Sequence, residues 1–199
     1  MSEQMSELKL VLASTSPFRK ELLARLKLPF ETVDPEVDET PRPGELPHQM
    51  AERLARSKAE SVADQFPDAL IIGSDQVATL DGLKPIGKPG DMEHAKAQLV
   101  ASSGREVTFF TGLCLHNTRD SVSWTDVIPY KVHFRELTDQ QIENYILLDH
   151  PENCAGSFKC ESLGVALFQS MEGEDPTSLI GLPLIRLSEW LITAGRSPL

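Results

Sequence analysis

A short apolar run near the middle of the chain constrains the fold most strongly. Ala69-Leu70-Ile71-Ile72-Gly73 carries no charge and ends at Ser74-Asp75-Gln76. Such a run suits a strand that is buried on both faces, as in the sheets of α/β proteins. Open α/β sheets bind ligands outside the carboxyl ends of their strands, so we expect Asp75 at such an end. A carboxylate there can hold a divalent metal or deprotonate a water, and the alternative is an aspartate that starts a turn.

Strand and helix patterns alternate along the rest of the chain. Strands are expected at 8–13, 30–33 and 165–168, with an antiparallel pair at 106–115 and 121–135. Helices are expected at 17–26, 48–66, 91–102, 138–148 and 184–194. Early alternation followed by a late hairpin predicts α/β architecture with a mixed sheet, in one domain that spans residues 1–199.

The balance of charged residues limits the partners of this chain. Its 199 residues carry 19 Lys and Arg against 30 Asp and Glu, which gives a formal net charge of −11. This excess argues against binding of a nucleic-acid polymer, which favours a basic face. A phosphate site in such a chain has to be a local basic pocket.

The number of cysteines and the hydropathy of the chain indicate the cellular compartment in which the protein is expected. No segment approaches the roughly 18–20 apolar residues of a membrane span, and the polar segment 1–7 does not have the pattern of a secretory signal. Three cysteines, an odd number, suit a reducing compartment. We therefore expect a cytoplasmic protein without a membrane partner, and a homodimer is compatible with this sequence.

The turn after the first expected strand suits a phosphate. Ser14 and Ser16 offer hydroxyl groups, and Arg19 offers a guanidinium that can fork onto phosphate oxygens. Ser16 also suits the N-cap of a helix that starts at Pro17. Free backbone N–H groups at such a junction favour an anion. The alternative is a serine cap followed by a solvated arginine.

A lysine interrupts an apolar stripe in the expected helix 48–66. Apolar residues recur there at steps of four, namely Met50, Leu54, Val62 and Phe66. Lys58 takes the missing step, so its ammonium either extends outward to solvent or meets a partner at the edge of the core. In the second case we expect it beside Asp75 and the phosphate turn. Lys88, between a glycine and a proline, is another stiffly held cation, unless it is only a solvated turn lysine.

Acidic residues suggest a metal site and a base-binding group. The segment 34–39 carries the carboxylates of Asp34, Glu36, Asp38 and Glu39. One of them can join Asp75 at a Mg²⁺ site, which also takes phosphate oxygens and waters. Glu161 lies in a short stretch that is expected to be extended, and it can accept hydrogen bonds from a base edge. The alternatives are a solvated acidic loop and a charged surface strand.

Together these segments resemble the Maf family of nucleotide pyrophosphatases over nearly the whole chain. The matching segments are Leu12-Ala13-Ser14-Thr15-Ser16-Pro17, Val37-Asp38-Glu39-Thr40, Lys58-Ala59, Ile72-Gly73-Ser74-Asp75-Gln76-Val77, Gly87-Lys88-Pro89, Thr111-Gly112, Ala155-Gly156-Ser157-Phe158-Lys159 and Leu179-Ile180-Gly181-Leu182-Pro183. The resemblance implies an α/β fold with a long, twisted mixed sheet flanked by helices, related in shape to the inosine triphosphate pyrophosphatases. It also implies hydrolysis of a nucleoside triphosphate between the α- and β-phosphates, with a divalent cation, Mg²⁺ or Mn²⁺.

Arg19, Gln76 and Glu161 resemble the YceF-like branch of this family, which acts on 7-methyl-GTP. The branch that hydrolyses dTTP and UTP usually has threonine and glutamine in place of Gln76 and Glu161. A carboxylate can accept both guanine donors, N1–H and N2–H₂, whereas a pyrimidine suits an amide. The resemblance thus implies Asp75 as the base and Glu39 with Asp75 as the metal ligands. It also implies Ser14, Ser16, Lys58 and Lys88 on the phosphates of a small-molecule nucleotide. The alternatives are a dTTP/UTP pyrophosphatase and a non-catalytic nucleotide-binding regulator of cell division.

Overall fold

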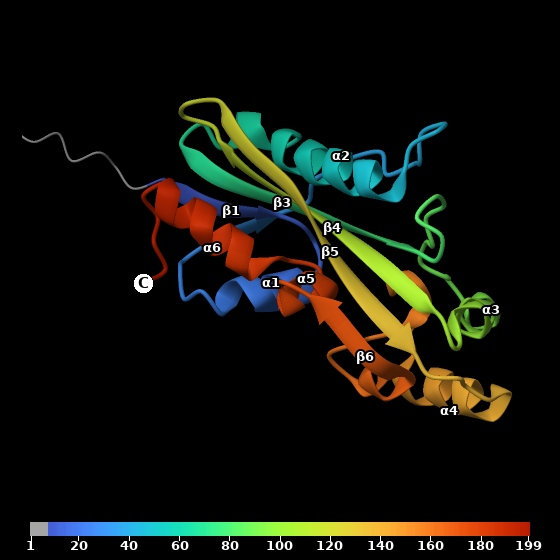
Figure 1. Ribbon diagram of the computed structural model, residues 1–199. Helices are drawn as coiled ribbons and strands as arrows, with labels where there is room; N and C mark the ends of the chain where they lie inside the picture. The colour runs from blue at the N-terminus through green and yellow to red at the C-terminus, as the bar shows by residue number, and fades with distance from the viewer. Residues whose placement is uncertain (1–7) are drawn as a thin grey trace, which may run out of the picture.

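One six-stranded mixed sheet organises the molecule, whose computed structural model describes residues 8–199 (Figure 1). The strands are β1 (Lys9–Ala13), β2 (Glu31–Val33), β3 (Ala69–Thr79), β4 (Glu106–Asn117), β5 (Val122–Phe134) and β6 (Phe168–Gly173), in the spatial order β2-β1-β3-β4-β5-β6. β1 is parallel to β2 and β3, and the remaining pairs are antiparallel. The expected α/β class, with a long mixed sheet flanked by helices, is confirmed. The polar segment 1–7, in which no secretory signal was expected, lies outside the described residues.

Helices cover the two faces of the sheet unequally. They are α1 (Pro17–Ala24), α2 (Pro47–Glu60), α3 (Met92–Ser102), α4 (Asp139–Asp149), α5 (Pro176–Ile180) and α6 (Leu184–Thr193). In Figure 1, α2 lies on one face of the sheet, α1, α5 and α6 lie on the other, and α3 and α4 lie toward the far end of the long hairpin. Separate apolar cores lie at the two ends of the molecule, one around Leu12 and Ile72 and another around Phe109 and Phe158. Within residues 8–199 no helix is long and apolar enough to cross a membrane.

Two sequence expectations about element boundaries are wrong. The helix expected at 48–66 ends at Glu60, and a 3₁₀ turn, Ala63–Gln65, follows. Phe66 precedes a proline, which disfavours helical backbone at that residue. The strand expected at 165–168 is instead a 3₁₀ helix, Leu163–Leu167, and β6 starts only at Phe168. Short apolar runs do not distinguish strand from helix by periodicity.

Asp75 is not at the carboxyl end of its strand, so that expectation is also wrong. β3 continues through Asp75 to Thr79, because β4 pairs with it along this whole length, from Leu70 to Thr79. The parallel pairing with β1, however, stops at Leu12 and Ile72. Beyond Ile72, β3 has β4 as a partner on one side and no β1 on the other. Asp75 therefore lies beside the end of β1, where the sheet leaves room for a ligand.

Two glycines bring α2 close to the sheet. A Cβ atom on Gly73 would lie 2.1 Å from the Ala55 carbonyl oxygen, and one on Gly112 would lie 2.1 Å from that of Ala51. Neither position tolerates a side chain, because both neighbours are helix backbone. This close approach places Lys58 of α2 next to Asp75 of β3.

Candidate active site

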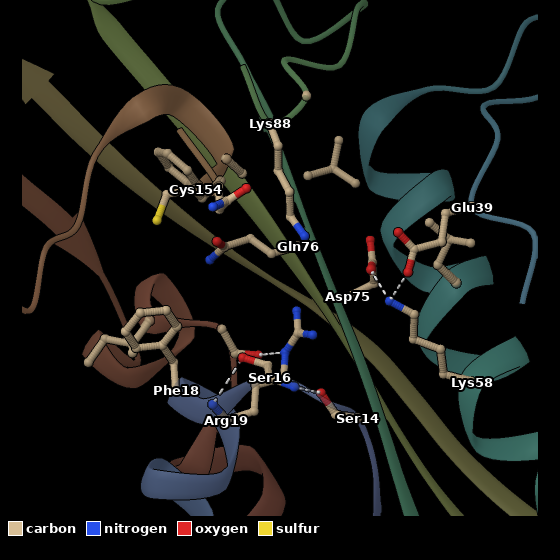
Figure 2. Close-up of a pocket in the computed structure, with 18 of the residues that line it drawn as sticks. Ser14, Ser16, Phe18, Arg19, Glu39, Lys58, Asp75, Gln76, Lys88 and Cys154 are labelled. Carbon is tan, nitrogen blue, oxygen red and sulfur yellow. Dashed lines mark hydrogen bonds and ion pairs between the residues drawn. The ribbon is translucent and has the colours of Figure 1, made fainter. Parts of the chain in front are cut away.

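A cleft of about 940 Å³ lies next to the free edge of β3 (Figure 2). Its walls come from the start of α1, the segment 34–41, α2, β3, and the segments 85–88, 153–161 and 179–181. Every candidate site residue from the sequence lines it, namely Ser14, Ser16, Arg19, Glu39, Lys58, Asp75, Gln76, Lys88 and Glu161. Groups that are distant along the chain thus converge on one volume.

Lys58 joins two carboxylates at one end of this cleft. Its Nζ lies 2.6 Å from Asp75 Oδ1 and 2.6 Å from Glu39 Oε1. The side chain of Lys58 is 8% exposed and that of Asp75 11%, whereas that of Glu39 is 56% exposed. The ammonium therefore does not extend to solvent, as one of the two sequence interpretations required, but meets partners at the edge of the core.

The charges around this cluster favour an ionised Glu39. Partial burial raises the pKa of Glu39, but the hydrogen bond and charge of Lys58, with Lys88 and Arg19, outweigh burial and hold that pKa below its ordinary value. Burial lowers the pKa of the Arg19 guanidinium, and the negative charges of Asp75 and Glu39 oppose that effect. Arginine nevertheless remains charged in proteins. This end of the cleft is thus a compact set of alternating charges.

A neighbouring ion pair holds the acidic segment in place. Arg53 of α2 donates two hydrogen bonds to Glu45 and one, of 3.2 Å, to the carbonyl oxygen of Thr40. The bonds from Arg53 lower the pKa of Glu45 to about 2. Asp38 is used locally, because its Oδ1 accepts from the Thr40 N–H at 2.9 Å. Of the carboxylates at 36, 38 and 39, the one that contacts Lys58 is Glu39.

The turn before α1 is built as its sequence predicts. Ser16 is the N-cap, and its Oγ accepts from the Arg19 N–H at 3.4 Å. Ser14 Oγ accepts from the Ser16 N–H at 3.1 Å, which leaves the hydroxyl hydrogen of Ser14 for another acceptor. Arg19 donates from Nε to the Gly181 carbonyl oxygen at 2.8 Å, and Figure 2 shows its guanidinium pointing into the cleft. The turn thus presents hydroxyl and guanidinium donors to the same space.

Gln76, the residue after Asp75 in β3, also lines the cleft, and hydrogen bonds hold its side-chain nitrogen in place. Its Nε2 donates to the carbonyl oxygens of Ser178 and Leu179, both at 2.9 Å, and lies 3.2 Å from Thr111 Oγ1. Within the described residues its Oε1 has no hydrogen-bond partner. The Gln76 Oε1 atom can therefore accept a hydrogen bond from a ligand in the cleft.

Lys88 and Glu161 reach the cleft from loops. Figure 2 shows the Lys88 ammonium pointing down toward the space between Gln76 and Asp75. Glu161 is exposed and lies in a turn, not in the extended stretch that the sequence predicted. The expected stretch is interrupted by left-handed backbone at Gly156 (φ +73°) and Ser157 (φ +62°), and the Ser162 N–H donates to the Lys159 carbonyl oxygen, which closes a turn around Glu161.

The carboxylate pair suits a divalent cation that shares its ligands with a substrate. Within residues 8–199 no group of three or more His, Cys, Asp or Glu side chains is placed to hold a metal. Mg²⁺ usually takes one or two carboxylates, with substrate phosphates and waters completing its octahedron. Glu39 and Asp75, at the mouth of a cleft lined with phosphate-binding groups, match that donor set.

Sequence reasoning missed some residues that line the site. Phe18 fitted the apolar spacing of a helix, yet it is half-buried and faces the cleft between Arg19 and α5. Its position between Pro17 and Arg19, inside the turn already singled out, was the available signal. The Gly181 carbonyl, which accepts from both Arg19 and Ser74, had no side-chain signal at all.

Comparison with known proteins identifies the class. The model of the family described as Maf-like protein matches residues 9–194, so the chain belongs to the Maf family. Among curated relatives, the 7-methyl-GTP pyrophosphatase of Pseudomonas syringae pv. tomato is 55% identical over 188 residues, which are 94% of this chain and 97% of that protein. The solved structure of the Staphylococcus aureus Ham1 protein aligns with a TM-score of 0.46 and 14% identity, over 64% of this chain and 72% of that one.

Proposed function

We propose that this protein is a nucleotide pyrophosphatase that hydrolyses 7-methyl-GTP to 7-methyl-GMP and pyrophosphate. The observation that carries the proposal is the Glu39–Lys58–Asp75 cluster in a cleft that Glu161 also lines. We call the part of the cleft around Lys58 and Asp75 the phosphate end and the part lined by Glu161 the base end. The relative named as a 7-methyl-GTP pyrophosphatase, 55% identical along nearly its whole length, supports the substrate. A phosphate anhydride suits the cationic side chains that line this cleft, and a cationic base suits the carboxylate of Glu161.

The phosphate end performs the hydrolysis. Asp75 uses Oδ1 toward Lys58, so its other oxygen is available to orient a water and accept its proton. Attack on the anhydride transfers negative charge to the departing pyrophosphate, and we expect Lys58, Lys88 and Arg19, which line the same cleft, to neutralise it. Ser14 and Ser16 hold phosphate oxygens at the start of α1.

A divalent cation completes this end. Pyrophosphatases of the Maf family generally need one, and Glu39 and Asp75 are the side chains that would hold it. When bound, it supplies Lewis-acid polarisation of the phosphate oxygens. We propose Mg²⁺ or Mn²⁺, because both are hard ions that prefer carboxylate and phosphate oxygens.

The other end recognises the methylated base. Methylation at N7 makes guanine cationic, so the Glu161 carboxylate accepts from N1–H and N2–H₂ and forms an ion pair as well. Gln76 Oε1 is a second acceptor at this end of the cleft. Phe18 offers an aromatic face, and a cationic ring stacked on such a face gains a cation–π attraction. An unmethylated purine loses both the charge pairing and that attraction.

A panel of nucleotides tests the proposal directly. The purified protein is incubated with Mg²⁺ or Mn²⁺ and with 7-methyl-GTP, GTP, UTP or dTTP, and the products are identified by ³¹P NMR. We expect pyrophosphate and 7-methyl-GMP, with 7-methyl-GTP the preferred substrate. Preference for UTP or dTTP would assign the chain to the pyrimidine-specific activity, and binding without turnover of any nucleotide would make it a regulator.

The proposed enzyme acts in the cytoplasm. Cys114, Cys154 and Cys160 are all free thiols, as a reducing compartment requires. Its partner is a small-molecule nucleotide and not a nucleic-acid polymer, since Arg19, Lys58 and Lys88 form a local basic group in a cleft of a chain whose net charge is −11. Homodimer formation stays a prediction, which light scattering on the purified protein checks.

A further inference from the structure

The carboxylate of Glu161 is placed by its backbone and not by side-chain contacts. Within residues 8–199 its one side-chain hydrogen-bond partner is the thiol of Cys160, whose Sγ lies 3.4 Å from Glu161 Oε2. Burial and the nearby Glu161 raise the pKa of Cys160 to about 12, so this thiol keeps its proton and donates weakly. A single weak donor does not fix a flexible glutamate. The position of the main chain at 161 therefore decides where the carboxylate lies.

That main chain forms a tight turn over residues 159–164, with Glu161 near its tip; we refer to it as the Glu161 turn. The N–H groups of Ser162 and Gly164 both donate to the Lys159 carbonyl oxygen, at 3.2 and 3.1 Å. A Cβ atom at Gly164 would lie 2.3 Å from that same oxygen, so only glycine allows this closure. The shape of the turn is thus fixed internally.

The end of α4 attaches this turn to the rest of the protein. Ser162 Oγ donates to Asp149 Oδ1 at 2.5 Å. Lys159 Nζ donates to the Asp149 carbonyl oxygen at 2.6 Å, and the Lys159 N–H donates to the Tyr145 hydroxyl at 3.0 Å. The contacts come from residues on both sides of Glu161 and reach one face of the last helical turn.

The anchoring side chains are buried and do not line the cleft. Tyr145 is 3% exposed and Asp149 8% exposed. Burial, with the neighbouring Asp149 carboxylate, raises the pKa of Tyr145, so its hydroxyl stays protonated while it accepts from Lys159. Neither these two residues nor Ser162 belongs to the lining of the cleft, so none of them touches a bound nucleotide.

We infer that Tyr145, Asp149 and Ser162 are positioning residues for Glu161 and thereby set the preference for a methylated purine. This inference rests on the proposed function, because it needs Glu161 to contact the base. The hydrolytic cluster of Lys58 and Asp75 lies on α2 and β3, and within residues 8–199 no hydrogen bond or ion pair joins these two residues to the Glu161 turn. Loosening the turn therefore changes selectivity and spares the rate of the chemical step.

The test measures the ratio of kcat/KM for 7-methyl-GTP to that for GTP. Ser162→Ala removes one hydrogen bond to a charged group, and we expect the ratio to fall about five-fold with kcat for GTP unchanged. Ser162→Thr keeps the hydroxyl and is expected to keep the ratio. Ser170→Ala, on the exposed face of β6, is the matched control for loss of a serine hydroxyl. Thermal unfolding of each variant verifies the fold.

A double-mutant cycle shows whether Ser162 acts through Glu161. We expect Glu161→Gln to lower the ratio, and Ser162→Ala to lower it no further in that background. The inference is overturned if Ser162→Ala lowers the ratio equally in the wild type and in the Glu161→Gln variant. It is also overturned if Glu161→Gln lowers the ratio and Ser162→Ala leaves it normal. In both cases the proposed function itself stands. A normal ratio in Glu161→Gln overturns the role of Glu161 in the proposed function, and the inference with it.

Discussion

The two ends of the cleft are built in different ways. At the phosphate end, Lys58 and Asp75 belong to a long helix and a long strand, and their charged atoms contact each other directly at 2.6 Å. At the base end, Glu161 lies in a turn and is exposed, with its position fixed through the backbone. Charged groups on a helix or a strand are held in position by the backbone of that element. A group on a turn moves when the residues that anchor the turn are changed.

In the proposed function, this difference assigns hydrolysis of the phosphate anhydride and recognition of the base to separate groups of residues. Water activation and charge neutralisation are common to all nucleoside triphosphates, so the phosphate end needs no information about the base. The base end can be altered at Gln76 or Glu161 without moving Asp75, since Gln76 is held by α5 and Glu161 by α4. A family with this architecture can change its substrate by substitutions at one end of the cleft.

The largest effect is expected at Asp75. Asp75→Asn keeps the shape of the side chain but removes the proton acceptor, so kcat should fall roughly 10³-fold for every nucleotide. Thermal unfolding should show an intact fold, because Asn Oδ1 can still accept from Lys58. The measurement is pyrophosphate release with cation present. Near-normal turnover would mean that Asp75 is not the base.

The next effect concerns Lys58, which holds the two carboxylates together. Lys58→Met removes a cation from the developing charge, and kcat should fall about 10²-fold. The same change leaves Glu39 and Asp75 as uncompensated carboxylates, so Mn²⁺ should bind the nucleotide-free variant more tightly than the wild type. Calorimetric titration with Mn²⁺ measures this. Lys88→Met, which removes a cation without a hydrogen bond to either carboxylate, is the control; an unchanged Mn²⁺ affinity in Lys58→Met would contradict the account.

A smaller and selective effect is expected at Glu161. Glu161→Gln replaces a charged acceptor by a neutral amide, so kcat/KM for 7-methyl-GTP should fall about 30-fold. The rate with UTP should stay level or rise, because an amide pairs with a pyrimidine edge. Steady-state kinetics with the two substrates compares them. A preference for 7-methyl-GTP over UTP equal to that of the wild type would remove Glu161 from base recognition.

The smallest effect concerns stability at the phosphate end. The pKa of Glu45 is lowered from 4.5 to about 2 by its bonds from Arg53, so this pair stabilises the fold above about pH 4.5 and loses its contribution as pH falls toward 2. Glu45→Gln should therefore be less stable than the wild type at pH 7, by roughly 1.5 kcal/mol, because the pair is hydrogen-bonded and the side chains of Arg53 and Glu45 are only 15% and 9% exposed. Urea unfolding at several pH values checks this, and a difference that grows on acidification would have the wrong sign.

The sequence predicted two local features around the phosphate end, namely Lys58 beside Asp75 and a helix that Ser16 caps. Lys58 interrupts an apolar helical stripe, which is a local signal, and Ser16 with Pro17 marks a helix start. Both features depend on short-range chemistry, so they are readable without the fold. The length of β3 is different, because β4 extends it past Asp75, up to Thr79, through pairing with residues 108–111, which are distant along the chain. No local pattern around Asp75 carries that information.

The base end was harder to predict. The stretch around Glu161 was expected to be extended, since Lys159 and Glu161 alternate, but Lys159 points to the end of α4 and not into the cleft. Its conformation depends on Tyr145 and Asp149, whose part in it shows only in the fold. Turns anchored by distant backbone groups leave little trace in a single sequence.

One competition experiment tests the separation of chemistry from recognition. An equimolar mixture of 7-methyl-GTP and UTP is hydrolysed by the wild type, by Asp75→Asn and by Glu161→Gln, and both monophosphate products are quantified in each reaction. The account predicts that Asp75→Asn lowers the sum of the products and keeps their ratio, whereas Glu161→Gln changes the ratio strongly and leaves UTP hydrolysis intact. If Asp75→Asn changed the ratio as much as Glu161→Gln does, the two ends would not be separable and the account would be wrong.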